Sequence, residues 1–331
     1  MIPITANHKK SQVACLLFGA FIHASQNCHA DWVPYDDFGD GVRDKQKWHY
    51  AYWKGGKAPY ESKGKLVLSV GGGAGSVRLP MEGELKQAGI DLSEAENHSL
   101  IGIKDPDVTG VRLEIMLSKS APLESGVFLG IFERTGPKKI SHASIELGNW
   151  DDGVRLGFEK ELFANGKSSG ENSKLLPANL GEPYRVTMLR DAGVIKVFND
   201  TTLVDSYPSA GKQIGYFIAA FNDDGLPMSA TIDNVQVYYP DSAPGRITSD
   251  LSKLSLNRGK PIAPYTARAN FMAKNFRISN LPPGLRYSKT TGVISGTPNV
   301  TGIYRVSITA EKMKGGKPVK TAKATKVFEV K

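Results

Sequence analysis

Apolar and polar residues alternate along short segments between residues 31 and 244. In the segment 111–117 the odd-numbered residues are Val, Leu, Ile and Leu, whereas the even-numbered residues are Arg, Glu and Met. A period of two predicts a β-strand with one buried face. Similar segments recur at short intervals and predict further strands at Leu66–Val70, Val127–Phe132, Val154–Phe158, Tyr184–Leu189, Val194–Phe198, Ile214–Phe221 and Ala230–Tyr239.

Helical periodicity is not sustained over ten residues anywhere in the chain. Alternating strands and helices, which a parallel α/β sheet requires, are therefore disfavoured. Many short strands separated by turns are typical of antiparallel sandwiches. The sequence predicts an all-β protein.

The first thirty residues have the composition of a secretory signal. Basic residues at His8–Lys10 precede an apolar run at Val13–Ile22, and small residues stand at Cys28 and Ala30. The run is shorter than the ~20 residues of a membrane span. We expect cleavage after Ala30 and a protein that is exported, to the periplasm, the cell surface or the medium. Both cysteines lie in this segment, so the exported part has no thiol chemistry, no Cys-type zinc site and no redox function.

The charge of the chain changes at a Pro/Gly/Ser-rich stretch, residues 239–245. The formal net charge of the 331 residues is +9. Residues 31–244 carry 23 Lys and Arg against 30 Asp and Glu, whereas residues 245–331 carry 17 against 3. Such a stretch is typical of a domain linker. A basic module of this kind is attracted to polyanions such as acidic envelope polymers; alternatively, its lysines only solubilise a β-domain. Specific nucleic-acid recognition is disfavoured, because no nucleic-acid-binding motif occurs.

Two motifs at the ends of residues 31–240 resemble the first and last strands of concanavalin A-like (laminin-G/glucanase-type) jelly rolls. They are Tyr35–Gly41, followed by Lys47-Trp48, and Thr231–Tyr238. The resemblance implies an N-terminal antiparallel jelly-roll sandwich. The first and last strands of such a sandwich lie side by side. Because the fold has many functions, the resemblance bears on structure more than on activity.

The resemblance also implies a structural calcium ion, held by Asp37 near the first strand and Asp233 on the last. Carboxylate oxygens are ligands that calcium prefers. The alternative interpretation is that Asp233 caps a bend and that Asp37 pairs with a lysine. No loop has the spaced ligands of a defined calcium motif.

Residues 246–331, after a linker at 241–245, closely resemble the putative-Ig (cadherin-like) repeats of bacterial surface proteins. The motifs are Asn280–Tyr287, Thr290–Pro298 and Gly302–Ala310. Pro-Pro-Gly in the first motif predicts a turn, and the third motif alternates like a strand. The resemblance implies a C-terminal Ig-like β-sandwich that acts as a spacer or surface-association module.

No motif for catalysis is visible. Glucanases of the jelly-roll class carry Glu-x-Asp-x-x-Glu on one strand, which places two carboxylates on the same face, and this pattern is absent. Three close carboxylate pairs are interpreted as solvated surface pairs: Glu82/Glu84, Glu94/Glu96 and Glu159/Glu161.

Aromatic and acidic residues favour a carbohydrate-binding site. Sugars are held by aromatic rings against their C–H faces and by carboxylates or amides at their hydroxyls. Trp48 is expected to be a core residue, and Trp150 is the better candidate for an exposed contact. The predicted ligand-binding residues are Trp150, Asp151, Asp152, Trp53, Asn222 and Asp223.

The sequence therefore predicts a non-catalytic, exported binding protein whose jelly roll recognises a glycan or another cell-surface ligand. Two alternatives stay open. One is a polysaccharide-active hydrolase or lyase whose acid and base come from different strands. The other is a purely structural envelope or adhesin protein. A carboxylate pair ~5–9 Å apart in a groove would favour the enzyme, whereas an aromatic platform without such a pair would favour binding.

Overall fold

The computed structural model describes residues 32–39, 41, 43–53, 55–72, 77, 97–164, 167–209 and 211–331. Every regular element in these ranges is a β-strand, which confirms the all-β prediction. No helix among the described residues is long and apolar enough to cross a membrane. The predicted signal, residues 1–30, lies outside the described residues, so export stays a prediction.

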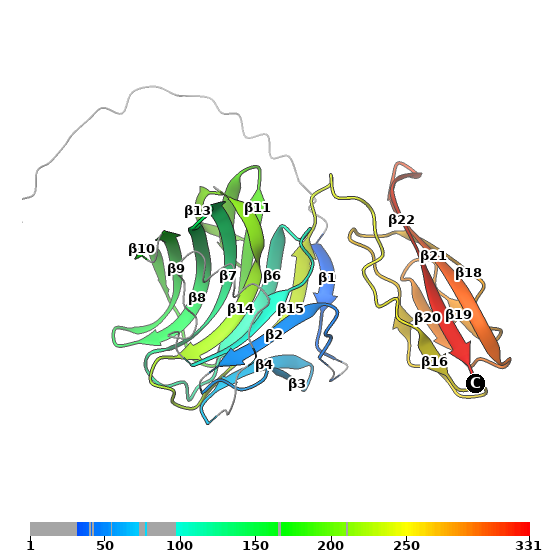
Figure 1. Ribbon diagram of the computed structural model, residues 1–331, viewed down its shortest axis with the longest axis horizontal. Coiled ribbons are helices and arrows are strands. Elements are labelled where there is room, and N and C mark those ends of the chain that lie inside the picture. The colour runs from blue at the N-terminus through cyan, green and yellow to red at the C-terminus, as the bar shows by residue number, and fades with distance from the viewer. Residues whose placement is uncertain are drawn as a thin grey trace, which may run out of the picture. The chain divides into compact units, whose positions relative to one another are not determined.

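The N-terminal part is a sandwich of two antiparallel sheets (Figure 1). Its eight-stranded sheet has the order β13 (Thr202–Pro208), β12 (Val194–Asn199), β11 (Tyr184–Asp191), β6 (Gly110–Leu117), β15 (Met228–Tyr238), β4 (Lys65–Val70) and β3 (Tyr60–Ser62), with β1 (Trp32–Asp36) paired to β15. The seven-stranded sheet has the order β10 (Lys167–Pro177), β9 (Gly153–Ala164), β8 (Lys139–Trp150), β7 (Ser125–Gly136), β14 (Lys212–Asn222), β5 (Asn97–Ile103) and β2 (Trp48–Trp53).

The first and last strands of the sandwich pair as the motifs predicted. Trp32 of β1 lies opposite Tyr238 of β15, and Asp36 lies opposite Val235. Trp48 is 1% exposed, and its Nε1 donates a hydrogen bond of 2.8 Å to Oδ2 of Asp36. Its role as a core residue is therefore confirmed.

Apolar residues of both sheets fill the space between them. The inward face of β6 consists of the four apolar residues of its alternating pattern, all of them 0% exposed. Because successive side chains of a strand point to opposite faces, the other residues of the seven-stranded sheet face outward. This outer face carries a smaller apolar cluster on β2, β5 and β14, and polar side chains on β8 and β9.

The C-terminal part contains two small sheets. One has the order β16 (Leu254–Leu256), β22 (Lys317–Val330), β21 (Gly302–Lys314) and β18 (Asn275–Ser279); the other has the order β17 (Tyr265–Thr266), β20 (Val293–Gly296) and β19 (Leu285–Tyr287). Their inward residues form a separate core. The predicted turn contains Gly284, whose φ of 93° favours glycine.

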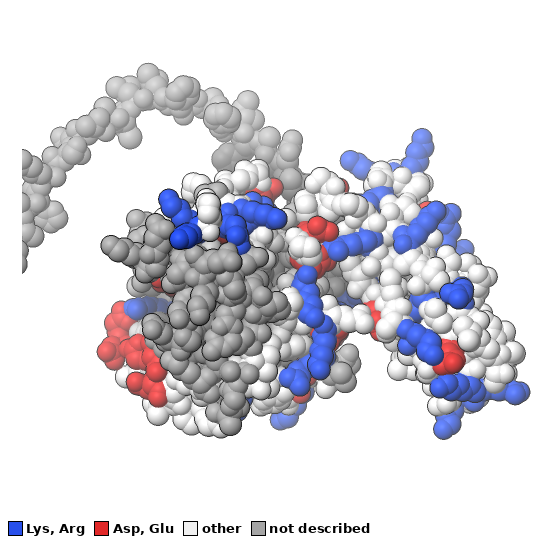
Figure 2. All heavy atoms as spheres, viewed as in Figure 1, with Lys and Arg blue, Asp and Glu red and all other residues white. Residues whose placement is uncertain are grey.

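Basic side chains spread over the visible face of this C-terminal part, and few acidic ones accompany them (Figure 2). One lysine is instead buried. Lys326 is 1% exposed, and its Nζ donates hydrogen bonds of 2.9 Å and 2.8 Å to the carbonyls of Asp250 and Ser252. The visible surface of the C-terminal part is therefore rich in positive charge. Lys326, by contrast, anchors the segment that leads into β16.

Candidate functional site

Two glutamates lie diagonally across the pair β8–β9 on the outer face of the seven-stranded sheet. Glu146 of β8 lies opposite Gly157, and Glu159 of β9 lies opposite Ser144. Diagonal neighbours on adjacent strands are about 7–8 Å apart. The register therefore brings together two carboxyl groups that are thirteen positions apart in the sequence.

Glu146 is half-buried, and its carboxyl group has an unusual proton affinity. Burial, the negative charge of Glu159 and that of Asp223 together raise the pKa of Glu146 to about 8, although the Arg155 guanidinium opposes them. Burial has this effect because it disfavours the charged form. Glu146 therefore keeps its proton at neutral pH.

Glu159 also has a raised pKa, because it is partly buried and lies near the negative charge of Glu161. His142 on β8 opposes this effect. The His142 ring lies between Phe132, stacked at 4.4 Å between centroids, and Glu161, whose Oε2 is 3.9 Å from Nδ1. Polar and titratable groups thus continue along β8 and β9 beyond the Glu146–Glu159 pair.

Trp150, the last residue of β8, lies beside the carboxyl group of Glu146. A Cβ atom at Gly148 would collide with Nε1 of Trp150 and would lie 2.9 Å from Oε1 of Glu146. Glycine at this position therefore leaves room for the indole and the carboxylate on the same face. Arg155 lies over the indole ring, 5.8 Å from its centroid, and its guanidinium is hydrogen-bonded to Asp152.

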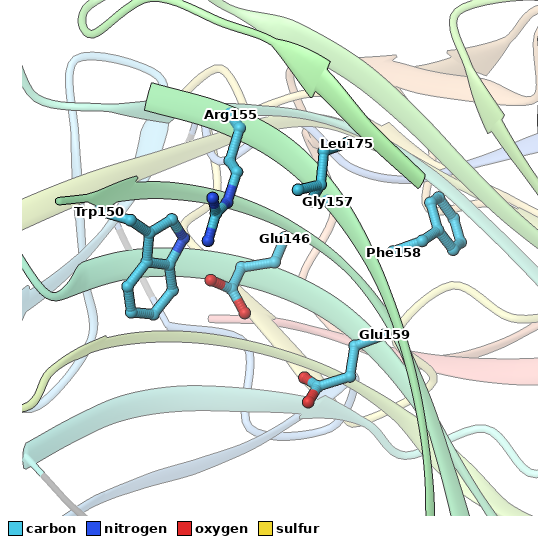
Figure 3. Close-up of a pocket in the computed structure, with 7 residues that line it drawn as sticks. All are labelled: Glu146, Trp150, Arg155, Gly157, Phe158, Glu159 and Leu175. Atoms are coloured by element: carbon cyan, nitrogen blue, oxygen red, sulfur yellow. The ribbon is translucent and has the colours of Figure 1, made fainter. Parts of the chain in front are cut away.

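These side chains surround a cavity of about 230 Å³ on the outer face of the sheet. Figure 3 shows Trp150 and Arg155 on one side of Glu146 and Glu159 on the other. The cavity thus combines an aromatic surface, a cation and two carboxyl groups. Its lining residues are Glu146, Trp150, Arg155, Gly157, Phe158, Glu159 and Leu175.

The structure brings some of the predicted ligand-binding residues to this cavity. Trp150 lines it, and Asp152 positions Arg155 at its rim. Asp151 is exposed in the turn between β8 and β9. Asp223 lies near enough to Glu146 to raise its pKa.

Asn222 has a structural role, contrary to its selection as a ligand-binding residue. It is 0% exposed, and its Nδ2 donates to the carbonyls of Leu123 and Glu124, each at 3.1 Å. Its Oδ1 accepts a hydrogen bond from the amide of Leu226. The side chain thus anchors the turn after β14. The backbone of Trp53 ends β2, but its side chain lies outside what the structure describes.

The two predicted calcium ligands have other partners. Asp233 accepts a hydrogen bond of 2.7 Å from the amide of Asn234, and its Oδ2 is 3.7 Å from Nζ of Lys65. Asp37 accepts a hydrogen bond from the amide of Gly39. In the described part of the chain, no three His, Cys, Asp or Glu residues are arranged to hold a metal ion. Calcium stays a prediction, which thermal unfolding with and without a chelator would test.

Glu146 was not recognised from the sequence because β8 itself was not. The strand alternates only over residues 143–148, because polar residues, Ser141 and Asn149, stand at the inward positions on either side. Glu159 was considered only with Glu161 and was interpreted as part of a solvated pair. This interpretation is wrong for Glu159, whose partly buried carboxyl group has a raised pKa. A search for Glu residues on any two alternating segments would have included both.

Known domains match the C-terminal part of the chain. Residues 237–331 match the family described as "Putative Ig domain", so the chain combines an N-terminal sandwich of two antiparallel sheets with a C-terminal region that matches this family. No curated protein matches the chain.

Solved structures similar to the sandwich have low sequence identity. A κ-carrageenase from Pseudoalteromonas carrageenovora, in complex with an oligotetrasaccharide of κ-carrageenan, is 11% identical with a TM-score of 0.45, over 66% of this chain and 99% of that one. The catalytic domain of an endo-1,3-β-glucanase (laminarinase) from Thermotoga petrophila RKU-1 is 13% identical with a TM-score of 0.45, over 64% and 100%. A carbohydrate-binding module, CBM66, from Bacillus subtilis is 17% identical with a TM-score of 0.32, over 43% and 82%.

Proposed function

We propose that the outer face of the seven-stranded sheet binds a glycan at the cavity between Trp150 and Glu159. The observation that carries this proposal is the combination of an aromatic ring, a guanidinium and two carboxyl groups around one cavity of about 230 Å³. The indole supplies an apolar surface for the C–H groups of a sugar ring. Arg155 and the glutamates supply donors and acceptors for its hydroxyls.

A second candidate function is cleavage of a glycosidic bond in the same cavity. The raised pKa of Glu146, about 8, favours this function, because a carboxylic acid that keeps its proton at neutral pH can protonate a leaving-group oxygen. Glu159 would supply the second carboxylate, either as a nucleophile or as the base that activates water. The separation of the two carboxyl groups distinguishes these two roles of Glu159. A distance of about 5–5.5 Å suits a nucleophile, and about 6.5–9.5 Å suits a base.

The experiment that separates binding from cleavage is a polysaccharide array on the full chain. Bound protein and released sugar ends are measured on the same spots. Binding to a defined glycan without released ends supports recognition alone, whereas released reducing ends support cleavage by Glu146 and Glu159. If the protein neither bound to any polymer nor released sugar ends from it, both functions would be contradicted.

Replacing Trp150 with alanine is expected to weaken glycan binding about 10- to 100-fold, because aromatic anchors in desolvated pockets dominate binding energies. The measurement is the dissociation constant for the glycan that the array identifies. Tyr60→Ala is a matched control, since Tyr60 is an aromatic residue of the other sheet and is 49% exposed. If W150A bound the glycan as tightly as the unchanged protein, the proposed site at Trp150 would be contradicted.

We also propose that the basic C-terminal module binds an acidic envelope polymer. Arg305 and Lys323 lie on the outer face of β21 and β22, among Ser307 and Thr325. Because exposed charges are screened by salt, binding to an acidic polysaccharide is expected to weaken steeply as the salt concentration rises. The double variant R305S/K323S should bind the polymer more weakly at low salt. A lysine-to-serine change at exposed Lys212 in the sandwich is the control, and equal losses in both would contradict the assignment.

A further inference from the structure

A second hollow lies at the opposite edge of the seven-stranded sheet, along β2. Its volume is about 430 Å³. Four of its lining residues belong to β2, two precede this strand and one follows β5. The lining residues are Arg43, Lys45, Trp48, His49, Tyr50, Tyr52, Ala58, Val77 and Lys104.

Three basic side chains lie around this hollow. Arg43, Lys45 and Lys104 are exposed, and none of them forms an ion pair with another residue in the described ranges. The neighbouring Lys47 differs, because its Nζ is 3.4 Å from Oδ2 of Asp36 and 3.5 Å from Oδ2 of Asp44. Arg43, Lys45 and Lys104 are therefore not neutralised by ion pairs, although the carboxylates of Glu61, Asp36 and Asp44 act on the Tyr50 side chain from the same region.

The positions of two of these cations are fixed by local contacts. Nζ of Lys104 is hydrogen-bonded to the carbonyl oxygen of Lys45, which ties the segment before β2 to the end of β5. The guanidinium of Arg43 lies over the Tyr50 ring, 5.5 Å from its centroid. Each group keeps further N–H donors that these contacts do not use.

The hydroxyl group of Tyr50 is buried. Its oxygen is inaccessible to solvent and forms no hydrogen bond with a residue that the structure describes. Burial raises the pKa of this phenol, and so do Glu61, Asp36 and Asp44, so the hydroxyl keeps its proton. Because its oxygen is closed off from solvent, the Tyr50 hydroxyl is not a contact for a ligand in the hollow.

We propose that this hollow binds a sugar residue that carries an anionic group, either a carboxylate or a sulfate ester. The anionic group would lie among Arg43, Lys45 and Lys104, which donate charge-assisted hydrogen bonds. The ring of Tyr52 would pack against the apolar face of the sugar. Cations beside an aromatic ring suit an anionic sugar better than an inorganic anion, because only the sugar has an apolar face that can pack against the ring.

The proposed anionic-sugar site is separate from the cavity at Glu146. In the sheet, β2 and β8 are separated by β5, β14 and β7, so the two strands are about 19 Å apart. Buried apolar residues of the outer face, among them Leu100 and Phe217, lie on the strands between them. A monosaccharide or disaccharide bound in one place does not touch the other. Loss of glycan binding at Glu146 would therefore leave binding at the anionic-sugar site unchanged.

Calorimetric titration of the full chain tests the proposal. The probes are short oligogalacturonates, sulfated galactose disaccharides and their uncharged counterparts. We expect the charged sugars to bind and the uncharged ones to bind at least 10-fold more weakly. The double variant R43Q/K104Q should lose at least 10-fold in affinity for the charged sugar, whereas K212Q, an exposed lysine on β14, should lose nothing. Equal affinity for charged and uncharged probes, or an unchanged R43Q/K104Q variant, would overturn it.

His49 provides a second measurement that needs no estimate of affinity. Burial and the positive charge of Lys104 hold the pKa of His49 below its usual value. A bound anion would stabilise the imidazolium form, so the NMR titration of His49 should shift to higher pH when the charged sugar is added. The W150A variant should show the same shift, which separates this site from the proposed glycan site. A charged sugar that binds without moving the His49 titration would place the ligand elsewhere and overturn the proposal.

Discussion

The variant E146Q is expected to lower any glycosidic-bond cleavage by the full chain about 10²- to 10⁴-fold, the usual contribution of a general acid. Glutamine keeps the size of the side chain and its place on β8, but it cannot donate a proton to the leaving oxygen. Binding of the same glycan should change far less, because the amide can still form hydrogen bonds. The measurement is the rate of reducing-end release at saturating glycan.

A pH profile of the same reaction distinguishes an acid from a merely structural carboxyl group. Since the pKa of Glu146 is raised to about 8, the fraction of protonated acid falls above this pH, and the rate should fall with it. The matched control is E182Q, an exposed glutamate just before β11 in the other sheet, which leaves the surroundings of Glu146 and Glu159 unchanged. A rate in E146Q equal to that of the unchanged protein would exclude Glu146 as the acid and leave recognition as the function of the cavity.

The same substitution has an expected effect on stability. In the folded chain Glu146 is protonated between pH 4.5 and about 8, whereas in the unfolded chain it is ionised over this range. The folded state then binds more protons, so the free energy of unfolding decreases as the pH rises through this window. E146Q removes this dependence and should be more stable than the unchanged protein at pH 8. Denaturant unfolding at pH 5 and pH 8 measures it, and a destabilised E146Q at both values would contradict the raised pKa.

Alternation of apolar residues was sufficient to predict much of the sandwich. Each of the eight predicted segments lies in a strand, except that the last runs one residue beyond β15, and the motifs at the ends of the domain predicted the pairing of β1 with β15. Strands such as β8 and β10 were missed, because small and polar residues occupy positions where an apolar pattern was required. Local pattern thus identified strands whose inward faces are rich in Val, Ile and Leu.

The candidate site depended on information that a local pattern does not contain. Trp150 could be selected because an aromatic residue beside acidic residues is a local feature. The proximity of Glu146 and Glu159 arises from the register between two strands, which the length of the β8–β9 turn determines. Asn222 was selected for its residue type, but the hydrogen bonds that make it structural come from the turn before β7, about a hundred positions earlier.

Replacing Glu133 with alanine is expected to lower the free energy of unfolding by about 1–3 kcal/mol, because it removes the hydrogen bonds from Arg190 and Ser209, whereas the partly exposed Arg190 keeps its hydrogen bond to the carbonyl of Gly211. Glu133 on β7 is 1% exposed, and its Oε1 accepts a hydrogen bond of 2.7 Å from Nε of Arg190 on β11. Oγ of Ser209 donates a second hydrogen bond of 2.5 Å to the same oxygen. The group therefore links the two sheets, and urea denaturation measures its contribution.

An exposed ion pair of the eight-stranded sheet provides the control for this prediction. Nζ of Lys196 is 3.4 Å from Oδ2 of Asp191, and both side chains are exposed to solvent. Exposed pairs contribute about 0–1 kcal/mol, so D191A should have little effect. The double variant E133M/R190M should be more stable than E133A, because it removes both charges and not one. If E133A were no less stable than D191A, the link between the sheets would have no energetic role, and the apolar faces of β6, β7 and β11 alone would hold this end of the sandwich together.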